Sequence, residues 1–371
     1  MAVDFEEMRR ELIYNLLKFS LSEGEANFDV FNGIGAEEWQ WTFGVLNMHG
    51  VAPLVGMALE SVPSELRPKG KVLMQFIAAN MSSSRSYEKL KILSERLREV
   101  MVANEIKCLS LKGLSLAEYY PRADLRKFLD IDLYAPDSSH KIDQVFASRG
   151  VKVNMDFYRH SHMTLGGVLV ENHHCLLDVR GRKRMAELDA DLRSMAEERL
   201  ASFDTPGLYY PDARFSLIFN LHHAMSHFVY EGISFKFLVD WVMFLRREKG
   251  YLTVNKDALS SDLSRHGLMK FAAVMSEVSV RHLGLALEDV PECIRAEMVG
   301  LKPRLVEMFE DDLFRPYEPS HKENLLAERV NNARRIIKAS WKPKAFLGQS
   351  AFGFVWDKLV PILLGQKFEA D

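Results

Sequence analysis

Apolar positions recur at helical spacing over most of the chain. Near the start, Phe5, Met8, Leu12, Leu16 and Phe19 lie three or four residues apart, as on one face of an amphipathic helix. Residues 71–104 contain no Gly or Pro and predict a second, long helix. After residue 182 the helical pattern returns and continues to the end, and 213–230 and 235–249 are typical of the apolar helices of a packed bundle.

Between residues 106 and 179 the pattern changes to short apolar runs that are broken by Gly, Pro and Asp. These runs predict strands that alternate with helices and end in a hairpin: a strand at 106–111, a helix at 114–120, a strand at 128–135, a helix at 138–149, a strand around 151–157, and a hairpin of 159–165 and 168–175 that turns at Gly166–Gly167. That order is typical of a small α/β domain. We therefore predict an α+β protein that is predominantly helical, divided into an N-terminal helical region (1–105), an α/β core (106–204) and a C-terminal helical domain (205–371).

Composition narrows the classes of function. The 371 residues include 48 Lys+Arg and 51 Asp+Glu, a net charge of −3, which argues against a protein that mainly binds the nucleic-acid backbone. The three cysteines, Cys108, Cys175 and Cys293, are too widely spaced for a disulfide framework. The first ten residues are acidic and lack the apolar stretch of a signal peptide. These features predict a cytoplasmic protein.

One uncharged stretch, Gln40–Leu59, has about the length of a membrane span. It contains Gln, Asn, His, Gly and Pro, which are costly in hydrocarbon. We therefore predict a buried helix, a turn at His49–Pro53 and a second short helix, and no contact with a membrane.

The most informative segment for chemistry is the predicted strand at 128–135. Because side chains alternate along a strand, Asp130 and Asp132 share one face, and the opposite face is wholly apolar. Two adjacent carboxylates repel each other unless a proton or a cation is shared. Oxygen ligands at this spacing suit Mg²⁺ held together with substrate phosphates. A strand with one solvated face is the alternative.

Two further segments flank this strand in sequence. Lys112–Gly113 joins a predicted strand to a helix, a place where free backbone N–H groups and a lysine can hold phosphate, although glycine there often only makes a turn. Glu171 and His173 share a face of the second hairpin strand, so Glu171 supplies a third carboxylate if the hairpin joins the same sheet. Asp178 is a competing third carboxylate, and simple polar decoration of the strand is the alternative for the histidines.

His223 and His227 lie one helical turn apart and form a possible two-histidine metal face. A metalloprotease motif would need Glu directly after the first histidine, where Ala224 stands. Histidines that pack between helices, hydrogen-bonded to a neighbour such as Asp240, are the favoured interpretation.

Taken together, these segments resemble the uncharacterised nucleotidyltransferase family of bacteria, within the DNA polymerase β-like nucleotidyltransferase superfamily. The resemblance extends from about residue 40 to 245. Its motifs are Met48-His-Gly-Val-Ala-Pro-Leu54, Leu111-Lys-Gly113, Tyr120-Pro121, Arg126, Asp130-Ile-Asp132, Val170-Glu-x-His-His174, His223-x-x-x-His-Phe228, Gly232-Ile233 and Asp240-Trp241.

This resemblance implies a nucleotidyltransferase-type mixed sheet flanked by the two helical regions. It implies metal-dependent transfer of a nucleoside monophosphate group from a nucleoside triphosphate to a hydroxyl of a small molecule or a protein. The implied roles are catalysis and the binding of Mg²⁺ (or Mn²⁺) for Asp130, Asp132 and Glu171; nucleotide binding for Lys112, Gly113, Ser115 and Arg126; and acceptor-side or structural roles for His173, His223, His227 and Asp240.

The chain departs from the family pattern at two places. The usual Gly-Ser pair is Gly113-Leu-Ser115, and Lys236 stands where Arg is more typical. These departures motivate an alternative, a non-catalytic module of the same fold that binds a nucleotide or a partner protein. A metal-dependent phosphohydrolase with water as acceptor is a third, weaker interpretation. The lack of a basic stripe disfavours a polymerase or a repair enzyme.

Overall fold

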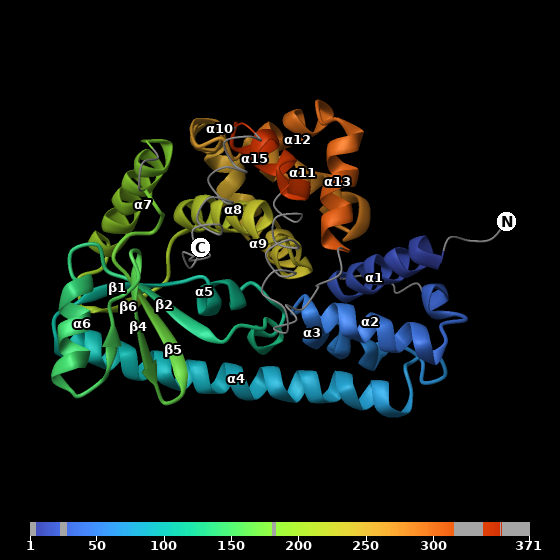
Figure 1. Ribbon diagram of the computed structural model, residues 1–371, viewed down its shortest axis with the longest axis horizontal. Coiled ribbons are helices and arrows are strands. Elements are labelled where there is room, and N and C mark those ends of the chain that lie inside the picture. Colours follow the sequence, from blue (N-terminus) through green and yellow to red (C-terminus); the bar gives the residue numbers. More distant parts are fainter. Residues whose placement is uncertain (1–4, 23–27, 180–182, 315–336, 349, 351–371) are drawn as a thin grey trace.

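Helices surround a single mixed sheet in the part of the chain that the structure describes. This structure is a computed structural model, and it describes residues 5–22, 28–179, 183–314, 337–348 and 350. The sheet lies at one end of the molecule, the N-terminal helices lie at the other, and the C-terminal helices cover the space between them (Figure 1). The predicted class, α+β and predominantly helical, is confirmed.

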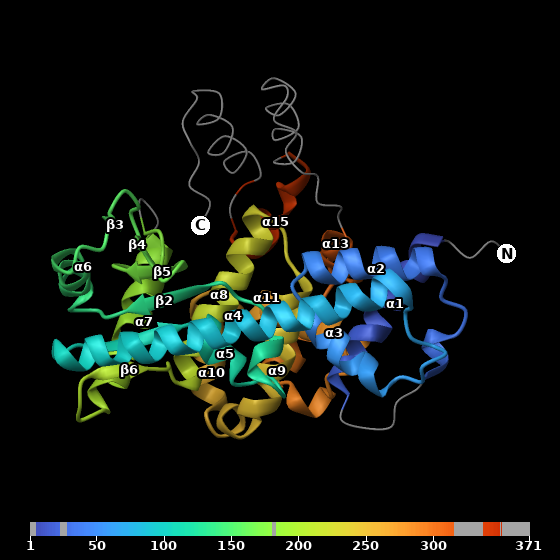
Figure 2. The same ribbon diagram turned by 90° about the horizontal axis from the view of Figure 1, so that it is seen from below.

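The longest element, α4 (Gly70–Ala103), connects these two ends. It has 34 residues, and both views show it running from the N-terminal helices to the sheet (Figures 1 and 2). Its first half buries Val72 and Phe76 among the N-terminal helices, whereas Leu90 and Leu97 pack beneath the sheet. The predicted helix at 71–104 is confirmed, and it belongs to two hydrophobic cores at once.

The N-terminal helices are α1 (Phe5–Leu21), α2 (Ala36–Met48) and α3 (Ala52–Ala58). The last two confirm the helix–turn–helix prediction for the uncharged stretch. No helix among the described residues is both long and apolar enough to cross a membrane. The turn between α2 and α3 carries His49, whose Nδ1 accepts a hydrogen bond of 3.1 Å from the backbone N–H of Phe235. The N-terminal helices are thereby joined to the first turn of α9 (Phe235–Val254), where such N–H groups lack intrahelical partners.

Burial of His49 makes the stability of the fold depend on pH. Its pKa is lowered from 6.5 to about 4 by burial. The unfolded chain therefore binds a proton that the folded chain excludes, and stability is lost as the pH falls from about 6.5 towards 4. Between pH 7 and pH 5 we expect His49 to contribute a loss of about 2 kcal/mol. Urea unfolding at the two pH values, compared with His49→Asn, measures this loss, because the Asn oxygen can accept the same hydrogen bond without titrating. An equal pH dependence in both proteins contradicts the prediction.

The sheet has six strands in the order β3-β4-β5-β2-β1-β6. The strands are β1 (Lys107–Leu111), β2 (Asp130–Tyr134), β3 (Val153–Asn154), β4 (His160–Leu165), β5 (Val168–His173) and β6 (Gly207–Tyr209). β2 pairs with β5 and β1 with β6 in parallel, and the other pairs are antiparallel. The first five strands confirm the sequence-based order. The sixth was not expected.

The two faces of the sheet have different partners. Ile131, Leu133 and Val170 share a core with α4 and with α6 (Ser139–Ser148). On the other face, Leu109 and Tyr134 belong to the core that contains α7 (Lys183–Ala201) and α8 (Ala213–Tyr230). Alternation along β2 therefore turns the apolar residues towards α4 and α6, and it turns Asp132 towards α8.

The short helix α5 (Gly113–Ala117) follows β1. The other helices that the structure describes lie in the C-terminal part. They are α10 (Lys256–Arg265), α11 (Met269–His282), α12 (Glu292–Val299), α13 (Pro303–Leu313) and α15 (Trp341–Phe346). The one-turn 3₁₀ helices are η1 (Phe28–Phe31), η2 (Leu59–Ser61), η3 (Ala123–Leu125) and η4 (Leu287–Asp289).

The helix predicted at 213–230 is confirmed in full. Its first turn is capped by Asp212, whose side chain accepts a hydrogen bond from the N–H of Phe215. The division at residues 105 and 204 stays a prediction.

Candidate active site

A cleft of about 1420 Å³ lies between the sheet and the helices α8 and α9. Strands β2, β4 and β5 contribute its polar floor, and the aromatic and histidine side chains of α8 and α9 form a wall. Ten of the predicted site residues line it: Lys112, Gly113, Arg126, Asp130, Asp132, Glu171, His173, His223, His227 and Asp240. Residues from distant parts of the sequence therefore meet in one place.

The carboxylates are brought together by the parallel pairing of β2 with β5. This register sets Asp132 opposite Glu171, and Asp130 lies two residues earlier on the same face. His173 Nε2 is 3.0 Å from Asp132 Oδ1 and 3.8 Å from Glu171 Oε2. Asp178, the competing third carboxylate, also lines the cleft, but it lies beyond the end of β5. The pairing of the strands thus favours Glu171 as the partner of the two aspartates.

Lys112 contacts the buried aspartate directly. Its Nζ is 2.8 Å from Asp132 Oδ1. Burial alone would raise the pKa of Asp132, but the Lys112 ammonium and the hydrogen bond from His173 outweigh it and hold that pKa below its ordinary value. Asp132 is therefore a carboxylate anion at neutral pH, and its environment supplies positive charge.

The backbone of Lys112 is strained. Its φ of 45° and ψ of −105° resemble the first central residue of a type II′ turn, a position that glycine ordinarily occupies. Such a conformation costs a residue with a Cβ on the order of 1–3 kcal/mol. This strained turn ends β1 and directs the lysine side chain at Asp132.

We expect Lys112→Gly to be more stable than Lys112→Ala by about 1 kcal/mol, because only glycine relieves the strain. Both variants lose the ammonium, so both should also lose affinity for a triphosphate. Urea unfolding with and without nucleotide separates the two effects. Glu105, the other described non-glycine residue with positive φ (55°), is exposed and does not line the cleft. Its Gly and Ala variants are the matched control, because they change a residue of positive φ without changing the affinity for a triphosphate. Equal stability of the two Lys112 variants contradicts the prediction.

The other residues predicted for the phosphate loop have local contacts. A Cβ added to Gly113 would lie 2.7 Å from the ring of Phe128, so this position needs glycine for packing. The Ser115 hydroxyl donates a hydrogen bond of 2.9 Å to the carbonyl oxygen of Lys112. Because α5 has only five residues, its dipole adds little attraction for phosphate. The ammonium of Lys112 is therefore the main positive charge that this loop offers to the cleft.

Arg126 and Asp240 form a buried pair at the side of the cleft. The guanidinium donates from Nε (2.8 Å) and Nη2 (2.9 Å) to the two oxygens of Asp240, and Nη1 donates to the carbonyl oxygen of Gly113. The Tyr120 hydroxyl donates to Asp240 at 2.8 Å. Asp240 thus holds Arg126 and Tyr120 and is not the hydrogen-bond partner expected for the α8 histidines.

The two α8 histidines lie on the wall of the cleft. The rings of His223 and His227 meet edge to face at 4.5 Å, and both contact Phe237. His227 Nδ1 is 2.6 Å from a carboxylate oxygen of Glu231. Burial, and then the nearby Lys112, lower the pKa of His223 well below its ordinary value, so this imidazole is neutral. The packing interpretation of this pair therefore accounts for its contacts.

Two histidines of β4 were not singled out from the sequence. His162 lies opposite Glu171 in the sheet, with Nε2 3.3 Å from Oε1, and His160 lies opposite His173. Burial lowers the pKa of His160 to about 3. The sequence did contain a signal for both histidines, the Gly166–Gly167 pair. Both glycines have positive φ, as a two-residue type I′ turn requires, and such a turn fixes which residues of β4 lie opposite Glu171 and His173.

The floor of the cleft has the donor chemistry of a divalent-cation site. Asp130 is half-buried, and its carboxylate forms no hydrogen bond or ion pair with the described residues. Asp132 already accepts a cationic ammonium. One ligand atom each from His160, Glu171 and His173 lie within 4.8 Å of one another. Carboxylate oxygens suit Mg²⁺ and Mn²⁺, whereas the imidazoles of His160 and His173 are ligands that Zn²⁺ prefers. The three carboxylates of the floor, Asp130, Asp132 and Glu171, therefore fit the cation that the sequence suggested.

Comparison with known proteins gives one match. The model of a family described as an uncharacterised nucleotidyltransferase matches residues 35–284. No curated protein and no solved structure matches the chain. The matched segment runs from the start of α2 to the end of α11 and includes the whole sheet and the wall of the cleft.

Proposed function

The chain belongs to the uncharacterised nucleotidyltransferase family, and we propose that it transfers a nucleoside monophosphate group from a nucleoside triphosphate to a hydroxyl of a small molecule or a protein. The observation that carries this proposal is the pairing of β2 with β5, which sets Asp132 opposite Glu171 on the floor of the cleft, next to Lys112. Paired carboxylates beside a lysine are suited to binding a metal triphosphate.

In this proposal Asp130, Asp132 and Glu171 would hold Mg²⁺ or Mn²⁺. When bound, the cation neutralises charge on the triphosphate and favours ionisation of a hydroxyl. The acceptor oxygen attacks the α-phosphorus and forms the new P–O bond, while the bond from that phosphorus to the α–β bridging oxygen breaks. Pyrophosphate leaves with the bonding electrons, and Glu171 accepts the hydroxyl proton.

Lys112 has two roles in this scheme. Without substrate its ammonium neutralises Asp132. A triphosphate offers the same ammonium several anionic oxygens, so Lys112 can leave Asp132 and stabilise the negative charge of the departing pyrophosphate. Lys236 also lines the cleft and supplies a second cation near Asp130. Its pKa is lowered, mainly by burial and to a smaller extent by repulsion from Arg126.

The cleft also has room for an acceptor. Its volume of about 1420 Å³ exceeds the roughly 300–1,000 Å³ of a pocket for one drug-sized ligand. The wall opposite the carboxylates combines Phe219, Phe237 and Tyr230 with the α8 histidines. Such a wall, together with the net charge of −3, supports a small molecule or a protein side chain as acceptor more than a polynucleotide.

A thermal-shift experiment with the full chain and the four nucleoside triphosphates, each with Mg²⁺, Mn²⁺ or neither, tests the proposal. We expect at least one triphosphate to raise the midpoint by several degrees only when a cation is present, because a ligand of the native state stabilises by mass action. No response to any triphosphate favours the non-catalytic module. Release of nucleoside monophosphate without an acceptor identifies a phosphohydrolase.

A further inference from the structure

A second group of metal-ligating side chains lies on the opposite face of the sheet from the cleft. It consists of His140 and Asp143 of α6 and His174, which follows the last residue of β5. Side chains alternate along a strand, so His173 points into the cleft and His174 points away from it. One ligand atom from each of the three residues lies within 4.8 Å of the others.

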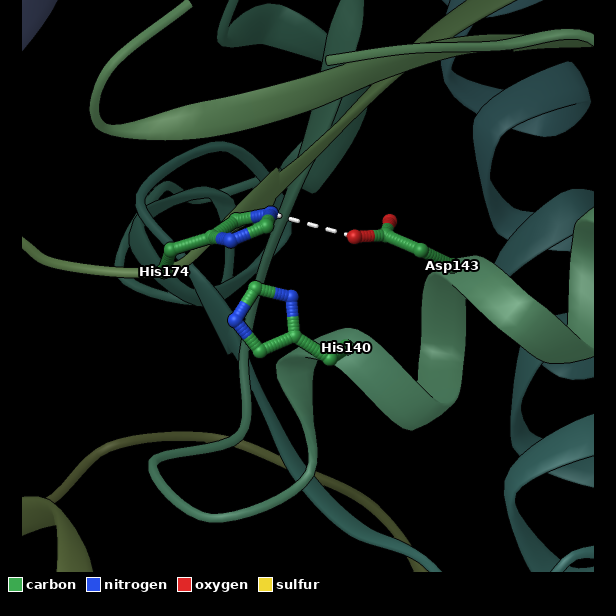
Figure 3. Close-up of side chains that lie close together, drawn as sticks. All are labelled: His140, Asp143 and His174. Carbon is green, nitrogen blue, oxygen red and sulfur yellow. Dashed lines mark ion pairs between the residues drawn. The ribbon is translucent and has the colours of Figure 1, made fainter.

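The three side chains converge on one point in space. His174 and Asp143 point towards each other, and the His140 ring lies beside them on the same helix as Asp143 (Figure 3). Residues three apart on a helix share a face, which explains why His140 and Asp143 are neighbours. The rings of His140 and His174 meet edge to face at 4.6 Å.

His174 and Asp143 are close enough for an ion pair, but the contact does not have the geometry of a hydrogen bond. His174 Nε2 and Asp143 Oδ2 are 3.1 Å apart, yet neither of these buried atoms has a hydrogen-bond partner of good geometry among the described residues. Ligand atoms on a tetrahedral Zn²⁺, at about 2.0–2.1 Å from the ion, lie roughly 3.3 Å from each other. The spacing of the two atoms therefore matches two ligands of one ion.

The carboxylate is oriented by buried partners. Asp143 Oδ1 accepts hydrogen bonds from Asn172 Nδ2 (2.8 Å) and from the Ser161 hydroxyl. Asn172 also donates to the carbonyl oxygen of Ser139. Asn172 and Ser161 are both fully buried, so they fix the carboxylate with Oδ2 free to face the histidines. Hydrogen bonds of this kind commonly orient the ligands of metal sites.

We infer that His140, Asp143 and His174 form a zinc site that joins α6 to the end of β5. Two imidazoles and one carboxylate select a borderline cation such as Zn²⁺ over Mg²⁺. His140 is exposed and gives the ion a path from solvent, which leaves the fourth position to water. This site is separate from the proposed nucleotide chemistry, because its ligands lie on the other face of the sheet.

The test uses the full chain, freed of metal by a chelator and then equilibrated with Zn²⁺ alone. His140→Ala removes one ligand without disturbing a buried contact, and Lys141→Ala, at the neighbouring exposed residue of α6, is the matched control. We expect His140→Ala to bind one Zn²⁺ fewer per chain than Lys141→Ala, as measured by atomic absorption. We also expect it to lose the Zn²⁺-induced rise of several degrees in the unfolding midpoint.

Two further measurements separate this site from the histidines of the cleft. With Co²⁺ as a probe, the visible spectrum of a tetrahedral centre should persist in His160→Ala and disappear in His140→Ala. His174→Ala should match His140→Ala. Equal stoichiometry and equal spectra in His140→Ala and Lys141→Ala overturn the inference, as does a Zn²⁺ signal that only His160→Ala removes.

Discussion

Replacing Asp130 and Asp132 together by Asn should lower the rate of metal-dependent pyrophosphate release on the order of 10³-fold or more. Asn keeps the shape of the side chain but removes the charge that holds a divalent cation and opposes the triphosphate. Loss of a group that acts mainly on the transition state lowers kcat and kcat/KM together. The measurement is pyrophosphate release with the triphosphate that gives the largest thermal shift.

Asp156→Asn is the control for this double variant. Asp156 is exposed and lines the same cleft, so its replacement removes a carboxylate from the cleft and leaves the strand pair intact. We expect this variant to keep most of the activity. Circular dichroism and the unfolding midpoint check that the double variant is folded. Undiminished release in a folded double variant would rule out the proposed role of the two aspartates.

Asp240→Ala should lower the free energy of unfolding by about 3–5 kcal/mol, because it leaves the Arg126 guanidinium buried without its partner. Arg126 is 6% exposed, and Asp240 accepts two of its hydrogen bonds and one from Tyr120. Urea unfolding of the wild type and the variant measures the loss.

The double variant Arg126→Met, Asp240→Leu shows whether the loss comes from the stranded charge. Replacing both partners of a buried ion pair by apolar side chains is often neutral or stabilising, so we expect most of the lost stability to return. The same protein tests the nucleotide role predicted for Arg126. If Arg126 contacts the triphosphate, KM for the nucleotide rises in the double variant; an unchanged KM shows that the pair is structural. A double variant as unstable as Asp240→Ala contradicts the stability prediction.

Much of the fold could be predicted because the periodicity is local. The helices α4 and α8 have nearly the bounds that apolar spacing and the absence of Gly and Pro indicated. The strand β6 could not be predicted in this way. It has three residues, too few to show alternation, and it becomes a strand only by pairing with β1, whose residues lie about a hundred positions earlier.

Part of the candidate site could likewise be predicted from the sequence, and part could not. Alternation with a period of two was enough to set Asp130 and Asp132 on one polar face, and the parallel pairing then brought Glu171 beside them. The partner of Arg126 was not readable, because the two side chains are 114 residues apart and meet only in the folded protein. His160 and His162 were readable in principle, since a two-residue turn fixes which residues face Glu171 and His173.

The topology of the sheet also implies an order of assembly during folding. In the β4–β5 hairpin, His162 and Glu171 are 9 positions apart. The contact of Asp132 with His173 joins residues 41 positions apart, and the contact of Lys107 with Phe203, beside β6, joins residues 96 positions apart. Loop-closure entropy grows with the logarithm of length, so each of these later contacts costs on the order of 1 kcal/mol more than the one before. We therefore expect the β4–β5 hairpin to form first and to bring the histidines and Glu171 of the cleft together. The aspartates should join when β2 pairs with β5, and β6 should pair with β1 last. Pulsed amide exchange during refolding measures this order.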